Sequence, residues 1–143
     1  MEEKKTAYTF EEFTEIVREL RAKCPWDSTL THKSLKPSMQ EEVEEVLEGL
    51  DLLEKTGEWD NLCEELGDVL LQVVLHSVIA QEEGLFTLDD VVDAIARKMI
   101  RRHPHIFGKS DLYKDYDGIP DWEEIKRLER EEKERQRGLR RNL

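Results

Sequence analysis

The chain has 143 residues, 39% of them charged, and a formal net charge of −12 at neutral pH. This length fits a single domain, although a core of this size is often completed by a partner subunit, and the charge argues against non-specific binding to nucleic acid. No apolar run approaches the roughly 20 residues of a membrane-spanning helix. The charged start over residues 1–5 is not followed by the apolar stretch of a secretion signal. The two cysteines are too few for a disulfide framework. We therefore expect a cytoplasmic protein that binds neither membrane nor nucleic acid.

The first predicted helix runs from Thr9 to about Lys23. Thr9 and Glu12 have the spacing of a capping box, in which each side chain accepts a hydrogen bond from the other residue's backbone amide. The apolar residues recur at the spacing of a core-facing stripe: Phe10, Phe13, Ile16, Val17 and Leu20. The segment Cys24-Pro25-Trp26-Asp27 ends this helix, and we expect a loop with a short turn as far as Leu35.

A second helix is predicted from Pro37 to about Lys55. Pro37 suits the first turn of a helix, and Ser38 with Glu41 has the spacing of another capping box. An apolar stripe follows the length of this helix: Met39, Val43, Val46, Leu47, Leu50 and Leu53. Gly57 then breaks the pattern.

A third helix is predicted from about Trp59 to Glu82, with Gly84 as a left-handed cap. Apolar residues surround its axis almost completely: Leu66, Val69, Leu70, Leu71, Val73, Val74, Leu75, Val78 and Ile79. A helix that is apolar nearly all round is a buried one, and three other helices of this length can hardly cover it. We therefore expect a homodimer or a higher symmetric oligomer.

The remaining elements lie beyond Gly84. Residues 87–90 start a fourth helix that ends near Arg102, where the segment His103-Pro104-His105 breaks it. We expect a turn-rich connector over residues 104–120 and a last, charged helix over residues 121–143. The sequence shows no internal repeat and no strand pattern. These elements predict an all-α protein with one domain over residues 1–143 and a helical core over residues 9–103.

Two pairs of carboxylates stand three residues apart, Glu42 with Glu45 and Glu65 with Asp68. Residues at this spacing share a helix face, with Cβ atoms roughly 5–6 Å apart, so each pair can close on one ion. The first pair borders the apolar stripe of its helix, and the second shares a narrow polar stripe with Gln72. Ionised carboxylates so close to a core are costly unless they are paired or bind metal.

The ligand chemistry of these pairs favours Mg²⁺, with Mn²⁺ as a substitute. Four carboxylates supply hard oxygen ligands, and residues 38–68 hold twelve acidic residues against one lysine. A di-iron centre normally takes a His three residues after a Glu on each of two helices, and this sequence has no such pair. A solvated acidic face is the other alternative. Because magnesium sites of this type keep positions open for substrate phosphates, we expect chemistry on phosphate.

Four cations crowd the end of the fourth predicted helix: Arg97, Lys98, Arg101 and Arg102. They form like-charge pairs one turn apart, and such pairs destabilise a helix unless an anion offsets them. The cluster is therefore a candidate phosphate-binding surface. The alternative is that these residues only complement the dipole at the helix C-terminus.

A series of short motifs runs along most of the chain: Cys24-Pro25-Trp26-Asp27, Thr31-His32, Ser34-Leu35, Glu41-Glu42-x-x-Glu45, Glu65-Leu66-Gly67-Asp68, Gln72-Val73-Val74, Glu83-Gly84-x-Phe86, Arg101-Arg102-His103-Pro104-His105-x-Phe107 and Trp122-Glu123-x-Ile125-Lys126. In this series the chain resembles the MazG nucleoside triphosphate pyrophosphohydrolases. The resemblance implies an all-α fold of the four-helix-bundle type, with an additional C-terminal helix and a core completed by dimerisation. It also implies Mg²⁺-dependent hydrolysis of a nucleoside triphosphate to the monophosphate and pyrophosphate.

The same resemblance assigns roles to individual residues. The implied magnesium ligands and catalytic carboxylates are Glu42, Glu45, Glu65 and Asp68, and Glu41 is implied to assist the attacking water. The residues expected to bind substrate are Lys98, Arg101, Arg102, Trp122 and Lys126. Many MazG proteins carry two tandem domains, whereas this chain holds one. No motif indicates which base is read.

One competing interpretation comes from a different class of protein. In it, a helical module is stiffened by metal and binds a protein partner through the last predicted helix, without catalytic activity. An assay of reaction products with Mg²⁺ separates the two interpretations.

Overall fold

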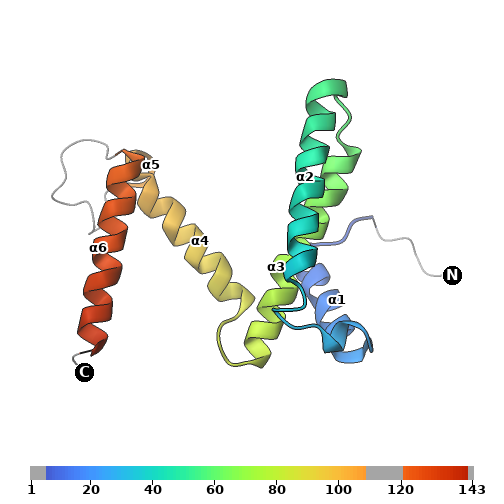
Figure 1. The fold of residues 1–143 in the computed structure, drawn as a ribbon, viewed down its shortest axis with the longest axis horizontal. Coiled ribbons are helices and arrows are strands. Elements are labelled where there is room, and N and C mark those ends of the chain that lie inside the picture. The colour runs from blue at the N-terminus through green and yellow to red at the C-terminus, as the bar shows by residue number, and fades with distance from the viewer. Residues whose placement is uncertain (1–5, 109–120, 142–143) are drawn as a thin grey trace. The chain divides into compact units, whose positions relative to one another are not determined.

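The computed structural model describes residues 6–108 and 121–141, and every regular element within these ranges is helical. The elements, in chain order, are α1 (Phe10–Lys23), a 3₁₀ turn (Asp27–Thr29), α2 (Lys36–Thr56), α3 (Asp60–Glu82), α4 (Leu88–Arg102), α5 (Pro104–Phe107) and α6 (Trp122–Arg141) (Figure 1). The predicted all-α class is confirmed.

The chain forms two compact units, which divide between Asp89 and Asp90. The first unit contains α1, α2 and α3. The second contains nearly all of α4, together with α5 and α6. The organisation as a single domain over residues 1–143 stays a prediction.

The capping box at the start of α1 is confirmed. The Thr9 amide donates to Glu12 Oε1 at 3.1 Å and the Glu12 amide donates to Thr9 Oγ1 at 3.2 Å. The box predicted from Ser38 and Glu41 is wrong, because α2 begins at Lys36 with no side-chain cap. A reciprocal pair of hydrogen bonds forms earlier instead, between Thr31 and Ser34, and it turns the chain toward the buried Leu35 that precedes the helix.

α2 and α3 lie side by side as an antiparallel hairpin (Figure 1). Gly57 closes α2 in the left-handed conformation, with φ at 78°, which glycine adopts without steric cost. Gly49 is buried on α2, and a Cβ added there would lie 3.1 Å from Leu62 Cα. The absence of a side chain at Gly49 therefore lets the two helices approach closely, so that residues along both face one another.

The core of the first unit gathers around the second half of α3. Its buried residues are Val17, Leu35, Val74, Leu75, Ile79 and Leu88. Arg21 ties the loop after α1 to this unit, since its Nη1 donates to the carbonyl oxygens of Asp27 and Leu30 at 2.7 Å each. The same side chain pairs with Glu82 at the end of α3.

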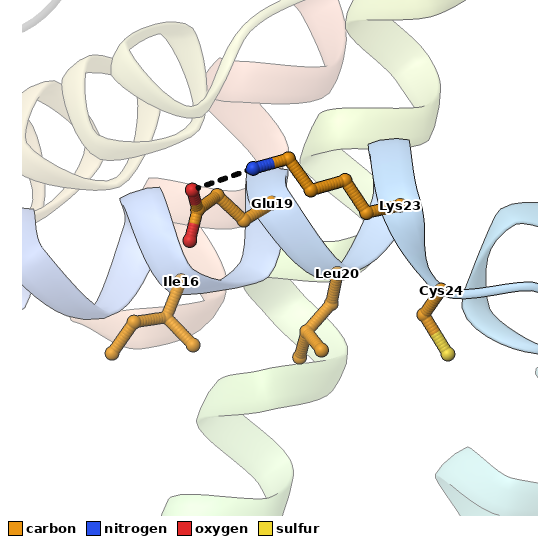
Figure 2. Close-up of a pocket in the computed structure, with 5 residues that line it drawn as sticks. All are labelled: Ile16, Glu19, Leu20, Lys23 and Cys24. Atoms are coloured by element: carbon orange, nitrogen blue, oxygen red, sulfur yellow. Dashed lines mark hydrogen bonds and ion pairs between the residues drawn. The ribbon is translucent and has the colours of Figure 1, made fainter.

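Burial of the predicted apolar stripes is incomplete within the chain. The side chains that stay exposed include Phe10, Ile16 and Leu20 on α1, Val43, Leu47 and Leu50 on α2, and Leu66, Leu70 and Val73 on α3. The helices of the chain therefore leave part of the apolar surface of α3 uncovered, as its apolar pattern predicted, and whether a partner subunit covers it stays a prediction. Ile16 and Leu20 of α1, with Cys24 directly after it, point to the same side of the helix, whereas Glu19 and Lys23 pair with each other on another side (Figure 2). These five residues line a shallow hollow.

This exposed apolar surface supports the predicted oligomer, and light scattering tests it. We expect a molar mass of at least about twice 16.9 kDa at micromolar concentration, because covering such side chains is worth about 25 cal/mol per Å² of apolar area. A mass of 16.9 kDa would contradict the prediction.

The connector predicted over residues 104–120 needs one correction. Its first residues form the short helix α5, in which Pro104 occupies the first turn and needs no amide partner. Residues 109–120 lie outside the described part of the chain. The last helix starts where it was predicted, since the Asp121 carboxylate accepts the Glu124 amide at 2.9 Å. In the ranges that the structure describes, no helix has the length and apolar character needed to cross a membrane.

Candidate functional site

The α2–α3 hairpin brings the two predicted carboxylate pairs together. Glu42 and Glu45 come from α2, and Glu65 and Asp68 come from α3. Each residue offers one oxygen, and the four oxygens all lie within 4.8 Å of one another. Both pairs have the spacing of one helical turn, so the close packing at Gly49 makes them face each other. Among the acidic, histidine and cysteine side chains of the described ranges, these four carboxylates are the group that lies close enough together to hold a metal ion.

The electrostatics of this acidic cluster disfavour four full charges. A hydrogen bond to Glu45 raises the pKa of Glu65 to about 7, helped by burial and by the charges of Glu45 and Asp68. Burial first, and then the charges of Asp68 and Glu45, also raises the pKa of Glu42. The folded protein therefore retains a proton on this cluster near neutral pH unless a cation takes its place.

Three buried oxygens mark the same stretch of the hairpin. Oε2 of Glu42, Oε2 of Glu65 and Oε1 of Gln72 have no hydrogen-bond partner among the described residues. Buried oxygens without a donor are costly. Four converging carboxylates with buried oxygens of this kind match the oxygen ligands that Mg²⁺ prefers. The residues present therefore fit a hard divalent cation.

Without metal, the free energy of unfolding is expected to fall as the pH rises from about 5 to about 8. The pKa of Glu65 is about 7 in the folded protein, against an ordinary value of 4.5. Between these two values the folded state binds more protons than the unfolded chain, so raising the pH favours unfolding. Melting temperatures in chelator across this range measure the effect, and saturating Mg²⁺ or Glu65→Gln should flatten it. Burial lowers the pKa of His76, which acts in the opposite direction, so the comparison with Glu65→Gln decides: a stability advantage of Glu65→Gln over wild type that does not grow as the pH rises would contradict the assignment.

Glu41 stands apart from this cluster. It is exposed on α2, and adjacent residues of a helix point in different directions. Its side chain is therefore not among the four converging carboxylates. The role of Glu41 in activating water stays a prediction.

Three of the four cations at the end of α4 have carboxylate partners within the second unit. Arg97 Nε lies 2.8 Å from Asp93. Arg101 and Arg102 both bind Glu129 of α6, which is 7% exposed. Their mutual repulsion is therefore offset inside the protein, and it no longer indicates an external anion by itself.

The predicted aromatic and basic residues of α6 join the same group. The guanidinium carbon of Arg102 lies 4.5 Å from the centre of the Trp122 ring, and Lys126 Nζ lies 5.6 Å from it. Cations stack favourably on aromatic faces at such distances. Arg101, Arg102, Trp122 and Lys126 thus form one connected cluster, which we call the α4–α6 basic cluster.

Sequence reasoning missed Glu129, which links this cluster. Its signal was present, because Trp122, Ile125 and Glu129 stand at positions i, i+3 and i+7 and share one face of α6. A charged residue on the apolar face of an otherwise charged helix indicates a buried ion pair.

Comparison with known proteins relates the hairpin that carries the four carboxylates to a known family. The family model of the MazG nucleotide pyrophosphohydrolase domain matches residues 30–107, more than half of the chain. The chain belongs to the MazG family. The matched range contains all four converging carboxylates and the cations of α4, whereas Trp122, Lys126 and Glu129 lie beyond it.

Individual relatives extend the MazG similarity over more of the chain. The uncharacterized protein YabN of Bacillus subtilis is 47% identical over 131 residues, which are 90% of this chain and 26% of YabN. The nucleoside triphosphate pyrophosphohydrolase/pyrophosphatase MazG of Thermotoga maritima is 46% identical over 136 residues, 94% of this chain and 50% of that protein. A nucleoside triphosphate pyrophosphohydrolase of Escherichia coli K12 is 41% identical over 110 residues, 77% of this chain and 40% of that protein. The chain thus spans half or less of the length of these relatives.

Proposed function

We propose that this chain hydrolyses nucleoside triphosphates to nucleoside monophosphate and pyrophosphate, with Mg²⁺ as the cofactor and Mn²⁺ as a substitute. The observation that carries the proposal is the convergence of four carboxylate oxygens within 4.8 Å on the α2–α3 hairpin of a MazG-family chain. Relatives from Thermotoga maritima and Escherichia coli carry names for this activity.

The acidic cluster supplies the metal ligands in this proposal. Glu42, Glu45, Glu65 and Asp68 hold magnesium, which when bound polarises a phosphoryl group and makes water a better nucleophile. The oxygen of water attacks the α-phosphorus, the bond from that phosphorus to the bridging oxygen breaks, and pyrophosphate leaves. Glu41 accepts the proton of the attacking water, in accordance with the family resemblance.

The substrate phosphates need cations as well. Lys98, Arg101 and Arg102 donate to phosphate oxygens in this proposal, and arginine can do so with two parallel hydrogen bonds. Trp122 and Lys126 extend the same binding surface, since they contact Arg102 or one another. The donors become more effective as negative charge develops on the leaving pyrophosphate.

Hydrolysis in ¹⁸O-labelled water tests which bond breaks. Attack at the α-phosphorus is expected to place the label in the nucleoside monophosphate and none in pyrophosphate. Mass spectrometry of both products measures this, with a panel of nucleotides to define base preference. Release of orthophosphate and a nucleoside diphosphate would contradict the proposal. A folded, Mg²⁺-binding protein that forms no product would favour the non-catalytic interaction module instead.

A further inference from the structure

One nearly buried carboxylate joins the end of α4 to α6. Glu129 accepts hydrogen bonds from Arg101 Nε at 3.0 Å, from Arg102 Nε at 3.1 Å and from Arg102 Nη2 at 3.0 Å. Its side chain is 8% exposed, and that of Arg102 is 13% exposed. Exposed ion pairs form and break freely, whereas a buried carboxylate with three charge-assisted bonds fixes its partners.

Glu129 does not use the whole hydrogen-bonding capacity of its partners. A guanidinium carries five N–H donors, and on Arg101 Glu129 engages the Nε–H alone. On Arg102 it engages the Nε and Nη2 edge, while the ring of Trp122 stacks on the guanidinium. Each arginine is therefore held in one orientation, and the outer Nη edge of Arg101 is not taken by Glu129.

Arg101 also lines a groove between α4 and α6. The groove has a volume of about 420 Å³, and its lining residues are Val91, Ala94, Ile95, Lys98, Arg101 and Lys133. Three of these residues are cations and none is acidic. A groove with this lining attracts anions.

We propose that Glu129 is a positioning residue, which holds Arg101 and Arg102 in the orientation that donates to the phosphate oxygens of the nucleotide. This inference rests on the proposed function. A free arginine side chain loses much rotamer entropy when it is fixed on a ligand. Since Glu129 fixes both arginines during folding, they lose no further rotamer entropy when substrate binds or when charge moves to the leaving group.

Glu129→Gln tests the proposal, with Glu131→Gln as the matched control. Both variants remove one negative charge from α6, but the partner of Glu131 among the described residues is the exposed Arg127. We expect Glu129→Gln to lower kcat/KM by about 10-fold to 100-fold, with a fall in kcat, because misplaced donors no longer match the transition state. Glu131→Gln should stay close to wild type.

The direction of the change in kcat and KM in Glu129→Gln distinguishes a positioning role of Glu129 from a role in neutralising charge. If Glu129 only neutralised the arginines, its removal would leave more positive charge for the substrate and would lower KM. If it only attached α6 to α4, the melting temperature would fall while the kinetics of the folded protein stayed unchanged. Either result would overturn the proposal. Should Glu129→Gln fail to fold, Arg101→Lys is the second variant, because it keeps the charge and loses the oriented guanidinium. An unchanged kcat/KM in Arg101→Lys would overturn the proposal as well.

Calorimetry with inorganic pyrophosphate and Mg²⁺ tests the positioning role of Glu129 by ligand affinity, without requiring turnover. We expect Glu129→Gln to raise the Kd at least about 10-fold and Glu131→Gln to leave it unchanged. If the wild-type protein binds pyrophosphate but hydrolyses no nucleotide, the proposed function is wrong. The Kd values of wild type and Glu129→Gln then still decide whether Glu129 positions the arginines. Equal or tighter binding by Glu129→Gln, or no binding by wild type, would overturn the inference.

Discussion

Asp68→Asn is expected to reduce nucleoside triphosphate hydrolysis by at least about 100-fold while leaving the fold intact, because a metal ion that polarises the phosphoryl group is worth several kcal/mol. Asp68 is one of the four carboxylates that converge on the hairpin. Glu65→Gln should have a similar effect. Steady-state assays with and without chelator measure the loss, and circular dichroism reports the fold. Glu64→Gln is the matched control, since Glu64 precedes Glu65 on α3 but lies outside the cluster.

The melting temperature of the same variant distinguishes a metal site from a structural ion-pair network. Without metal, full ionisation of the cluster is unfavourable, because the hydrogen bond to Glu45, burial and the neighbouring charges raise the pKa of Glu65, and burial and the neighbouring charges raise that of Glu42. In chelator, Asp68→Asn should therefore melt at the same temperature as wild type or higher. A clearly lower melting temperature in chelator would mean that the carboxylates stabilise the fold. Full turnover in either Asp68→Asn or Glu65→Gln would remove these residues from the mechanism.

Arg102→Ala is expected to lower kcat as well as raise KM, with a combined loss of roughly 2–4 kcal/mol, if Arg102 donates to the transition state as other preorganised groups do. If Arg102 only complemented the helix dipole, kcat/KM would stay nearly unchanged and stability would fall by about 0.3–1 kcal/mol. The structure adds that Glu129 loses two of its three hydrogen bonds in this variant. A lower melting temperature is therefore expected in both cases, and the kinetics of the folded protein decide.

Arg97→Ala serves as the control for Arg102→Ala. Arg97 lies on the same helix, is exposed and pairs with Asp93, one turn away. Although Arg97 belongs to the four-cation group of α4, it is not among the residues expected to bind substrate, so its removal should leave kcat/KM nearly unchanged. Equal kinetic losses in Arg97→Ala and Arg102→Ala would indicate a general effect of charge on α4. Unchanged kinetics in Arg102→Ala would remove Arg102 from the substrate site.

Most of the secondary structure could be predicted from the sequence, because local chemistry decides it. The capping box of Thr9 and Glu12, the left-handed Gly57 and the carboxylate of Asp121 each mark a helix end through contacts within four residues. The start of α2 was predicted to within one residue, at Pro37 instead of Lys36, but the capping box of Ser38 and Glu41 was wrong. The bonds between Thr31 and Ser34 and the buried Leu35 precede the helix, so Ser38 already lies inside it.

The sequence by itself determined the metal-site candidates, because pairs three residues apart must share a helix face wherever the helix lies. Only the tertiary structure decided that the two pairs converge, since this depends on the approach of α2 and α3 at Gly49. It also decided what the cations of α4 contact. The sequence shows that Arg101 and Arg102 are crowded, but their partner Glu129 lies 27 residues beyond Arg102. The helical spacing of Trp122, Ile125 and Glu129 places Glu129 on the apolar face of α6, but a contact over 27 residues is fixed by how helices pack, so only the tertiary structure decided that Arg101 and Arg102 are its partners.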